Sequence, residues 1–157
     1  MPERVRVDAV IQAAMDMEAA PFLHELAPLG DAETPDAVLG GSRMTQRFAL
    51  GELEGKSVLV VTSGIGLANA ACATARALAL VDTPVVIAAG TTGGLARDIN
   101  VGDIAAGTTA IYGQADATAF GYAPGQIPQM PVDYTSSEAA AARLDDLSDV
   151  ISHRVRI

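Results

Sequence analysis

The sequence contains no tryptophan, and its aromatic side chains are limited to three tyrosines and three phenylalanines in 157 residues. A core must therefore be built from aliphatic side chains, which is feasible because half of the residues are hydrophobic. Cysteine occurs once, at Cys72, so no disulfide can form within the chain, as is typical of a reducing compartment. The alanine-rich apolar segment around Cys72 predicts a small buried thiol.

Positive charge is also scarce, because 10 basic residues stand against 19 acidic ones and leave a net charge of -9. Such a surface repels the phosphates of nucleic acids and of anionic membranes, so neither kind of partner is expected. No apolar run approaches the roughly 18 residues of a membrane span, and the first ten residues do not resemble a leader. These features predict a soluble, cytoplasmic protein.

The pattern of apolar residues predicts one α/β domain over residues 1–157. The expected elements are a strand in 5–14, a helix over 17–28, a β-hairpin over 44–64, a helix over 67–81 and a buried strand over 83–90. Pro21 should lie in the first turn of its helix, and Gly55 should form the hairpin turn. This order favours a mixed, mostly parallel central sheet flanked by helices.

The C-terminal part of the chain predicts a further strand over 101–113 and a helix over 136–147, capped by Ser136 or Ser137. After this helix an apolar alternation typical of a strand begins and stops at Ile157. We therefore expect the chain to be the N-terminal portion of a longer domain.

Ligands of open α/β sheets bind beyond the carboxyl ends of the strands, and three segments are expected there: 13–18, 62–66 and 89–96. In the last of these, AGTTGG (89–94) can direct backbone N–H groups and hydroxyls at a polar ligand, although a plain loop is the alternative. Glu18 lies among alanine and methionine, whose desolvation would raise its pKa toward that of a general base. A carboxylate that serves the N-terminus of a helix is an equally good interpretation of Glu18.

Other motifs are less informative. GIGLAN (64–69) resembles a dinucleotide fingerprint but has Asn69 in place of its last small residue, so a tight strand-to-helix turn is the simpler interpretation. No Walker lysine follows a glycine-rich loop, which excludes a P-loop. His24 and His153 lack a second ligand at metal spacing, so neither a metal nor a cofactor is expected.

Four of the six aromatic residues, Tyr112, Phe120, Tyr122 and Tyr134, gather around the segment DATAFGYAPGQIP (116–128). Its glycines and prolines cannot continue a helix or a central strand. Contact with another molecule is the expected purpose of this loop.

Four stretches of the chain resemble the 5'-methylthioadenosine/S-adenosylhomocysteine nucleosidases, members of the nucleoside phosphorylase superfamily. They are AAMDMEA (13–19), SGIG (63–66), AGTTGGLARDINVGDI (89–104) and DATAFGYAPGQIP (116–128), of which the last is specific to the nucleosidase branch. The resemblance implies hydrolysis of the N-glycosidic bond of methylthioadenosine or adenosylhomocysteine, with release of adenine, in methionine salvage.

By this resemblance Glu18 is the catalytic glutamate that activates the attacking water. The implied substrate contacts are Met15 against the ribose, Ile65 on the 5' side of the sugar, Thr91 in place of the family's usual serine, and Thr92 and Gly93 on the adenine side. The family's catalytic acid and ribose-binding glutamate belong to a later segment that has no counterpart in this sequence.

The resemblance also implies a homodimer in which the aromatic loop closes the pocket of the neighbouring subunit. Ala117, Phe120 and Pro128 would there cover the 5'-alkylthio group of the nucleoside substrate. Two alternatives are another phosphorylase or nucleosidase of the superfamily, and a degenerate subunit that binds nucleosides without catalysis.

Overall fold

The computed structural model describes residues 4–29, 36–39 and 46–157, which form two compact units, Met1–Thr92 and Gly93–Ile157. The first unit contains β1 (Val5–Arg6), β2 (Ala9–Ala13), α1 (Asp16–Glu25), β3 (Asp36–Leu39), β4 (Arg47–Leu53), β5 (Lys56–Thr62), α2 (Leu67–Leu80), β6 (Val81–Asp82) and β7 (Val86–Ala88). The prediction of a mixed α/β fold is confirmed. That residues 1–157 form one domain stays a prediction.

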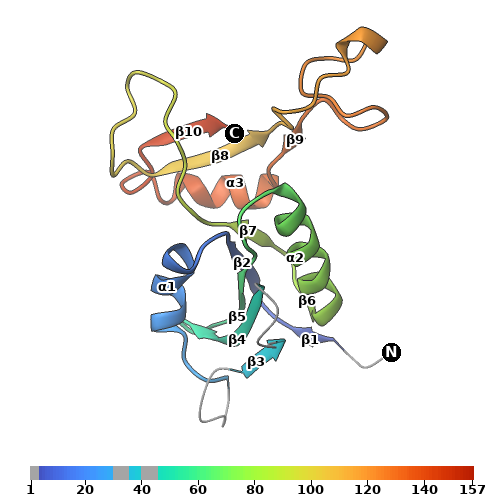
Figure 1. Ribbon diagram of the computed structural model, residues 1–157. Coiled ribbons are helices and arrows are strands. Elements are labelled where there is room, and N and C mark those ends of the chain that lie inside the picture. Colours follow the sequence, from blue (N-terminus) through green and yellow to red (C-terminus); the bar gives the residue numbers. More distant parts are fainter. Residues whose placement is uncertain (1–3, 30–35, 40–45) are drawn as a thin grey trace. The chain divides into compact units, whose positions relative to one another are not determined.

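The main sheet of the first unit has the strand order β3-β4-β5-β2-β7 (Figure 1). Strand β2 runs parallel to both β5 and β7, whereas β4 is antiparallel to β3 and β5. Because parallel strands end at the same edge, the connections that follow β2, β5 and β7 meet there. This edge carries the three segments that the sequence predicts for ligand binding.

The two faces of this sheet are covered by different helices, which lie on opposite sides of it in Figure 1. Side chains alternate between the faces because the period of a strand is two residues. One face packs with Ala73 and Ala77 of α2 through Val10, Leu59, Val61 and neighbouring apolar residues. The other face consists of Ile11, Val58 and Val60, which cluster with Phe22 and Leu26 from α1 and its C-cap. Both helices are therefore fixed by burial that is mostly aliphatic, with Phe48 and Phe22 as the aromatic members of the two clusters.

The hairpin of β4 and β5 confirms its prediction from the sequence, apart from residues 44 and 45, which lie outside the described residues. Leu53 pairs with Lys56, so the turn consists of Glu54 and Gly55 alone. Both turn residues have positive φ angles, 50° and 72°, as a two-residue hairpin turn of type I′ requires. Strand β5 is central, with partners on both sides.

Helix α1 is shorter than predicted and begins one residue earlier, at Asp16. Pro21 therefore lies inside the helix, and its predicted place in the first turn is wrong. The helix ends early because Ala27 leaves it and exchanges two backbone hydrogen bonds with Glu52 of β4, at 2.8 and 2.9 Å. This pairing ties the end of α1 to the sheet.

Two predictions of burial are wrong. Strand β7 was expected to be buried, but it is the edge strand of the sheet, and Val86 and Ile87 are exposed. Cys72 is exposed as well, because α2 presents Ala73 and Ala77, rather than the position of Cys72, to the sheet. Among the described helices, none has the length and apolarity needed to span a membrane.

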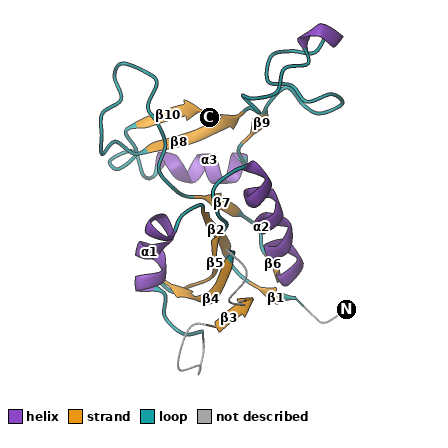
Figure 2. Ribbon diagram, in the orientation of Figure 1, coloured by secondary structure: helices purple, strands orange, loops and turns teal. Residues whose placement is uncertain are grey.

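The second unit contains β8 (Ala105–Ala110), the short helix η1 (Thr118–Phe120), β9 (Tyr134–Thr135), α3 (Glu138–Asp145) and β10 (His153–Arg156). Its sheet has the order β10-β8-β9, with β8 parallel to β10 and antiparallel to β9. Figure 2 shows that the chain between β8 and β9 is almost entirely loop. The predicted helix and its cap are confirmed, since the Ser137 hydroxyl accepts a hydrogen bond from the Ala140 N–H.

Gly51 provides a test of the contact between α1 and the sheet. A Cβ atom at this position would lie 2.5 Å from the Ala27 carbonyl oxygen and 2.6 Å from the Leu26 Cγ. We expect Gly51→Ala to lower the free energy of unfolding by about 1–3 kcal/mol, because the backbone must move apart. Urea denaturation measures the loss as a lower midpoint. Gly113→Ala is the matched control, since nothing lies within 4 Å of its Cβ position, and equal midpoints for both variants would contradict the prediction.

Candidate active site

Glu18 lies where the chain passes from β2 into α1. It is the third residue of the helix, and its side chain turns back toward the N-terminus. Its Oε2 atom accepts hydrogen bonds from the backbone N–H groups of Ala14 at 3.1 Å and Met15 at 3.0 Å. Glu18 therefore satisfies N–H groups that precede the helix, which is the structural role that the sequence left open.

The second carboxylate oxygen of Glu18 is held by the segment that follows β7. Its Oε1 atom accepts a hydrogen bond from the Thr91 N–H at 2.8 Å and another from the Thr91 hydroxyl at 2.7 Å. This meeting follows from the topology, because β2 and β7 are parallel neighbours. Glu18 and Thr91, both predicted site residues, are thus brought into direct contact.

The hydrogen bonds determine the ionisation of Glu18. The N–H and then the hydroxyl of Thr91 hold the pKa of the Glu18 carboxyl below its usual value, and the N–H groups of Met15 and Ala14 act in the same direction. Desolvation raises the pKa but is outweighed. The expectation of a raised pKa is therefore wrong, because it considered only the apolar neighbours and not the donors. Glu18 is an anion at neutral pH.

Gly90 brings the backbone close to this carboxylate. A Cβ atom at Gly90 would lie 3.0 Å from both the carboxyl carbon and the Oε1 atom of Glu18. A side chain at this position would displace the carboxylate from its donors. The glycine before Thr91 thus has a steric reason that the sequence alone did not show.

A cleft of about 570 Å³ lies at the same edge of the sheet. It is lined by residues from the β2–α1 and β5–α2 connections: Ala14, Met15, Asp16, Met17, Thr62, Gly64, Ile65 and Asn69. Met15 and Ile65, predicted as substrate contacts, share this cleft. Met15 is also one of the backbone donors to Glu18, so the carboxylate and the cleft are adjacent.

The β5–α2 connection is a tight turn, as the simpler interpretation of GIGLAN predicts. Gly64 and Gly66 have φ angles of 83° and 106°, which side chains rarely adopt. The Asn69 side chain donates a hydrogen bond to the Ile65 carbonyl at 2.8 Å and lies 3.2 Å from the Cβ position of Gly64. Asn69, the departure from the fingerprint, therefore fixes the turn that presents Ile65.

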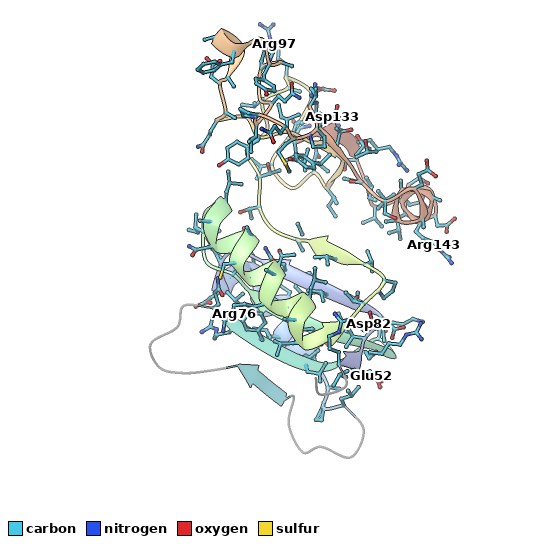
Figure 3. All side chains as sticks on the ribbon, turned by 90° about the vertical axis from the view of Figure 1, so that its right-hand side faces the viewer. Glu52, Arg76, Asp82, Arg97, Asp133 and Arg143 are labelled. Atoms are coloured by element: carbon cyan, nitrogen blue, oxygen red, sulfur yellow. The ribbon has the colours of Figure 1, made fainter. Side chains whose placement is uncertain are left out.

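A polar network fixes α2 against the sheet behind this turn. The Gln12 amide donates to the Ala70 carbonyl at 3.3 Å and accepts from the Thr74 hydroxyl at 2.8 Å. Gln46, which is buried, accepts a hydrogen bond from Arg76 at 2.6 Å and donates one to the Asn69 carbonyl at 3.1 Å. Figure 3 shows Arg76 on α2. The position of Asn69, and with it the cleft wall, depends on this network.

Sequence reasoning missed Arg47, which borders the cleft, and assigned no role to Asp16, Met17 and Thr62, although these lie in the segments 13–18 and 62–66 that it expected at this edge. Arg47, at the start of β4, donates a hydrogen bond to the carboxylate of Asp16. Nothing in the sequence indicates this pair, because its members are 31 residues apart and lie on different elements. Thr92 is exposed at the end of the first unit, and Gly93 begins the second. Their contacts with adenine stay predictions.

The aromatic loop belongs to the second unit and holds its own shape. The Asp116 carboxylate accepts hydrogen bonds from the N–H of Thr118 at 3.0 Å and from its hydroxyl at 2.7 Å. Ala117 is buried within the loop, whereas Pro128 is exposed and Phe120 is 83% exposed. The Phe120 ring is thus left without a covering in its own unit, and its contact with a neighbouring subunit stays a prediction.

Within the described ranges, no group of three or more histidine, cysteine, aspartate or glutamate side chains that could hold a metal ion is present. His24 is 86% exposed. His153 lies 2.8 Å from the Asp103 carboxylate and links β10 to the loop before β8. These positions agree with the solvated and structural roles expected for them.

Comparison with protein families matches residues 8–155 to the phosphorylase superfamily, so the chain belongs to this superfamily. The match spans the carboxylate at the end of β2, the glycine-rich turn before α2 and the segment after β7.

Curated relatives of this chain are 5'-methylthioadenosine/S-adenosylhomocysteine nucleosidases. The protein from Actinobacillus succinogenes is 42% identical over 106 residues, which are 68% of this chain and 46% of the relative. That from Anoxybacillus flavithermus is 45% identical over 91 residues, or 58% of this chain and 39% of the relative. The chain spans less than half the length of these relatives.

Solved structures lead to the same group. The nucleosidase from Neisseria meningitidis in complex with methylthio-immucillin-A is 33% identical, with a TM-score of 0.76, 95% of this chain covered and 62% of the other. The nucleosidase from Colwellia psychrerythraea in complex with adenine is 32% identical, with a TM-score of 0.76 and coverages of 95% and 60%. The fold is therefore shared with nucleosidases crystallised with methylthio-immucillin-A and with adenine.

Thr91→Val tests the cause of the low Glu18 pKa. The variant keeps the backbone N–H but loses the hydroxyl donor, so the pKa of Glu18 should rise toward its usual value. The ionised carboxylate stabilises the fold above the pKa of the unfolded state, and this contribution is lost as the pH falls through the folded-state pKa. The variant should therefore lose stability at neutral pH and show a weaker loss on acidification.

The carboxyl ¹³C shift of Glu18, followed by NMR as a function of pH, measures this pKa. Thr91→Ser keeps a hydroxyl and should keep the low value. A Glu18 pKa that is the same in the valine variant as in the unsubstituted chain would show that the hydroxyl has no such effect.

Gly90→Ala tests the close approach to the carboxylate. The added methyl group should displace the Glu18 side chain and raise its pKa as hydrogen bonds are lost, with little change in the rest of the fold. The same NMR titration measures the effect, and Gly113→Ala is again the control for an added methyl group in open space. An unperturbed Glu18 resonance in Gly90→Ala would refute the steric argument.

Proposed function

We propose that this chain carries the catalytic base of a nucleosidase. This enzyme would hydrolyse the N-glycosidic bond of 5'-methylthioadenosine and S-adenosylhomocysteine and release adenine. One observation carries the proposal: an ionised Glu18 is held at the carboxyl ends of β2 and β7, next to a cleft lined by Met15 and Ile65. The names of the curated relatives agree with this chemistry.

The proposed role of Glu18 is to accept a proton from water. The water oxygen forms a bond to the anomeric carbon of the ribose as the bond from that carbon to the adenine nitrogen breaks. One water proton passes to Glu18, the bonding electrons leave with adenine, and adenine gains a proton from an acid. The proposal assigns the role of base to Glu18 and assigns no described residue to the acid.

The donors around Glu18 determine how strong a base it is in this step. They keep the carboxylate ionised at neutral pH, and because a low pKa also weakens a base, the loss of one donor would strengthen it. Of its four donors, three are backbone N–H groups, and the fourth is the Thr91 hydroxyl, which can rotate about its C–O bond. Rotation of this hydroxyl would open a place on Oε1 for the attacking water.

The remaining assignments follow the same proposal. Met15 would contact the ribose, Ile65 the 5' side, and Thr92 and Gly93 the adenine. In a cytoplasmic homodimer, Phe120 with Ala117 and Pro128 would cover the 5'-alkylthio group in the pocket of the neighbouring subunit. The exposure of Phe120 supports such a contact, since a large aromatic ring gains most from removal from water. Adenine release would serve methionine salvage.

Glu18→Gln tests the proposal directly. We expect adenine release from methylthioadenosine, followed by chromatography, to fall by about 10²- to 10⁴-fold, because the amide cannot accept the proton. Binding of the nucleoside should persist in the variant. Omission of phosphate from the buffer should leave the rate unchanged, because water is the nucleophile.

Glu52→Gln is the matched control, since Glu52 is an exposed glutamate on β4 (Figure 3) and should behave like the unsubstituted chain. Circular dichroism checks that each variant is folded. Undiminished activity of Glu18→Gln would refute the role of the base, and a strict requirement for phosphate would indicate a phosphorylase instead.

A further inference from the structure

Two opposite charges border the cleft at the start of α1. The Asp16 carboxylate lines the cleft and accepts a hydrogen bond from the Arg47 guanidinium at the start of β4. The side chains of Asp16 and Arg47 are 73% and 56% exposed. An ion pair this exposed contributes little to folding, because water and salt screen it. Its charges are therefore available to a ligand at small cost.

The strand register explains why Arg47 reaches this place. Arg47 pairs with Thr62, the last residue of β5, and Thr62 itself lines the cleft. The first residue of β4 is thus at the same edge as the end of β5. A basic side chain from the hairpin and an acidic side chain from α1 meet there.

An apolar surface lies in the same cleft as the ion pair. Met17 and Ile65 are 72% and 70% exposed and both line the cleft. Two such side chains, one of them a thioether, suit an alkylthio chain that extends from a bound nucleoside. The cleft therefore combines a place for a thioether with a pair of opposite charges.

We propose that Arg47 and Asp16 bind the amino-acid end of S-adenosylhomocysteine, Arg47 through the carboxylate and Asp16 through the ammonium group. This inference rests on the proposed function. Methylthioadenosine ends in a methyl group, whereas the tail of S-adenosylhomocysteine ends in a carbon that bears both a carboxylate and an ammonium group. A zwitterion of this kind matches two opposite side chains that already lie together, because each charge of the ligand meets its opposite. Arg47 is thus a specificity residue that distinguishes the two nucleosides.

The test compares dissociation constants for the two nucleosides by isothermal titration. Glu18→Gln is used as the background, so that neither ligand is consumed. We expect the added Arg47→Gln substitution to weaken binding of adenosylhomocysteine more than binding of methylthioadenosine. The ratio of their dissociation constants should rise by about five- to tenfold, because one charge-assisted contact is lost. The effect should shrink as the salt concentration rises from about 0.05 to about 0.5 M.

Arg143→Gln is the matched control, because Arg143 on α3 also forms an exposed ion pair, with Asp146 at 4.0 Å (Figure 3). It removes the same charge from the chain, and the ratio should not change. A ratio that Arg47→Gln leaves unchanged would overturn the inference while the proposed function stands. Failure of either nucleoside to bind the background protein would overturn the proposed function, and this inference with it.

A change in the ligand keeps the test decisive if Arg47→Gln does not fold. The analogue 5'-(3-aminopropylthio)-5'-deoxyadenosine retains the ammonium group of the adenosylhomocysteine tail but has no carboxylate. It should bind the background protein about five- to tenfold more weakly than adenosylhomocysteine, and Arg47→Gln, where folded, should weaken it no further. Equal affinity for the analogue and adenosylhomocysteine would overturn the assignment of Arg47 to the carboxylate.

Discussion

The carboxylate of Glu18 is held by donors from two segments 73 residues apart, and the geometry of the site depends on their meeting. The parallel pairing of β2 with β7 brings Thr91 to the end of β2, and the absence of a side chain at Gly90 lets the backbone approach. A carboxylate with four donors is stable as an anion without a cationic partner. The site therefore joins the connection after β2 to the segment after β7.

The apolar packing supports this arrangement from both sides of the sheet. Helix α1 carries Glu18 and is fixed by the cluster around Ile11 and Val60, while α2 packs closely through Ala73 and Ala77. Small side chains on α2 allow a close approach that aromatic residues would prevent. The polar network from Gln12 and Gln46 then fixes the turn of α2 at Asn69.

Local features were predictable from the sequence, whereas features that depend on distant pairing were not. The turn at Glu54 and Gly55 and the helix at α2 follow from turn chemistry and from helix propensity, which act over a few residues. The exposure of β7 depends on its place at the edge of the sheet, which its apolar sequence does not specify. The raised pKa that the neighbouring residues predict for Glu18 is wrong for the same reason. Its strongest donor, Thr91, is far away in the sequence.

The residues of the candidate site likewise include some that the sequence predicts and some that depend on distant pairing. Glu18, Met15, Ile65 and Thr91 could be found because ligand sites follow the ends of parallel strands, and the resemblance gave each a role. The pair of Arg47 and Asp16 could not be found, since it forms only when the hairpin register places Arg47 opposite Thr62.

The four donors also remove the symmetry of the Glu18 carboxylate. Both contacts of Oε2 are backbone N–H groups, whose directions are fixed by the start of α1, whereas one contact of Oε1 is a hydroxyl with rotational freedom. The two oxygens of an isolated carboxylate are equivalent, but these two are not. In the proposed role of Glu18, a proton would reach Oε1 once the Thr91 hydroxyl has rotated away, so the direction of approach would be selected before any substrate binds.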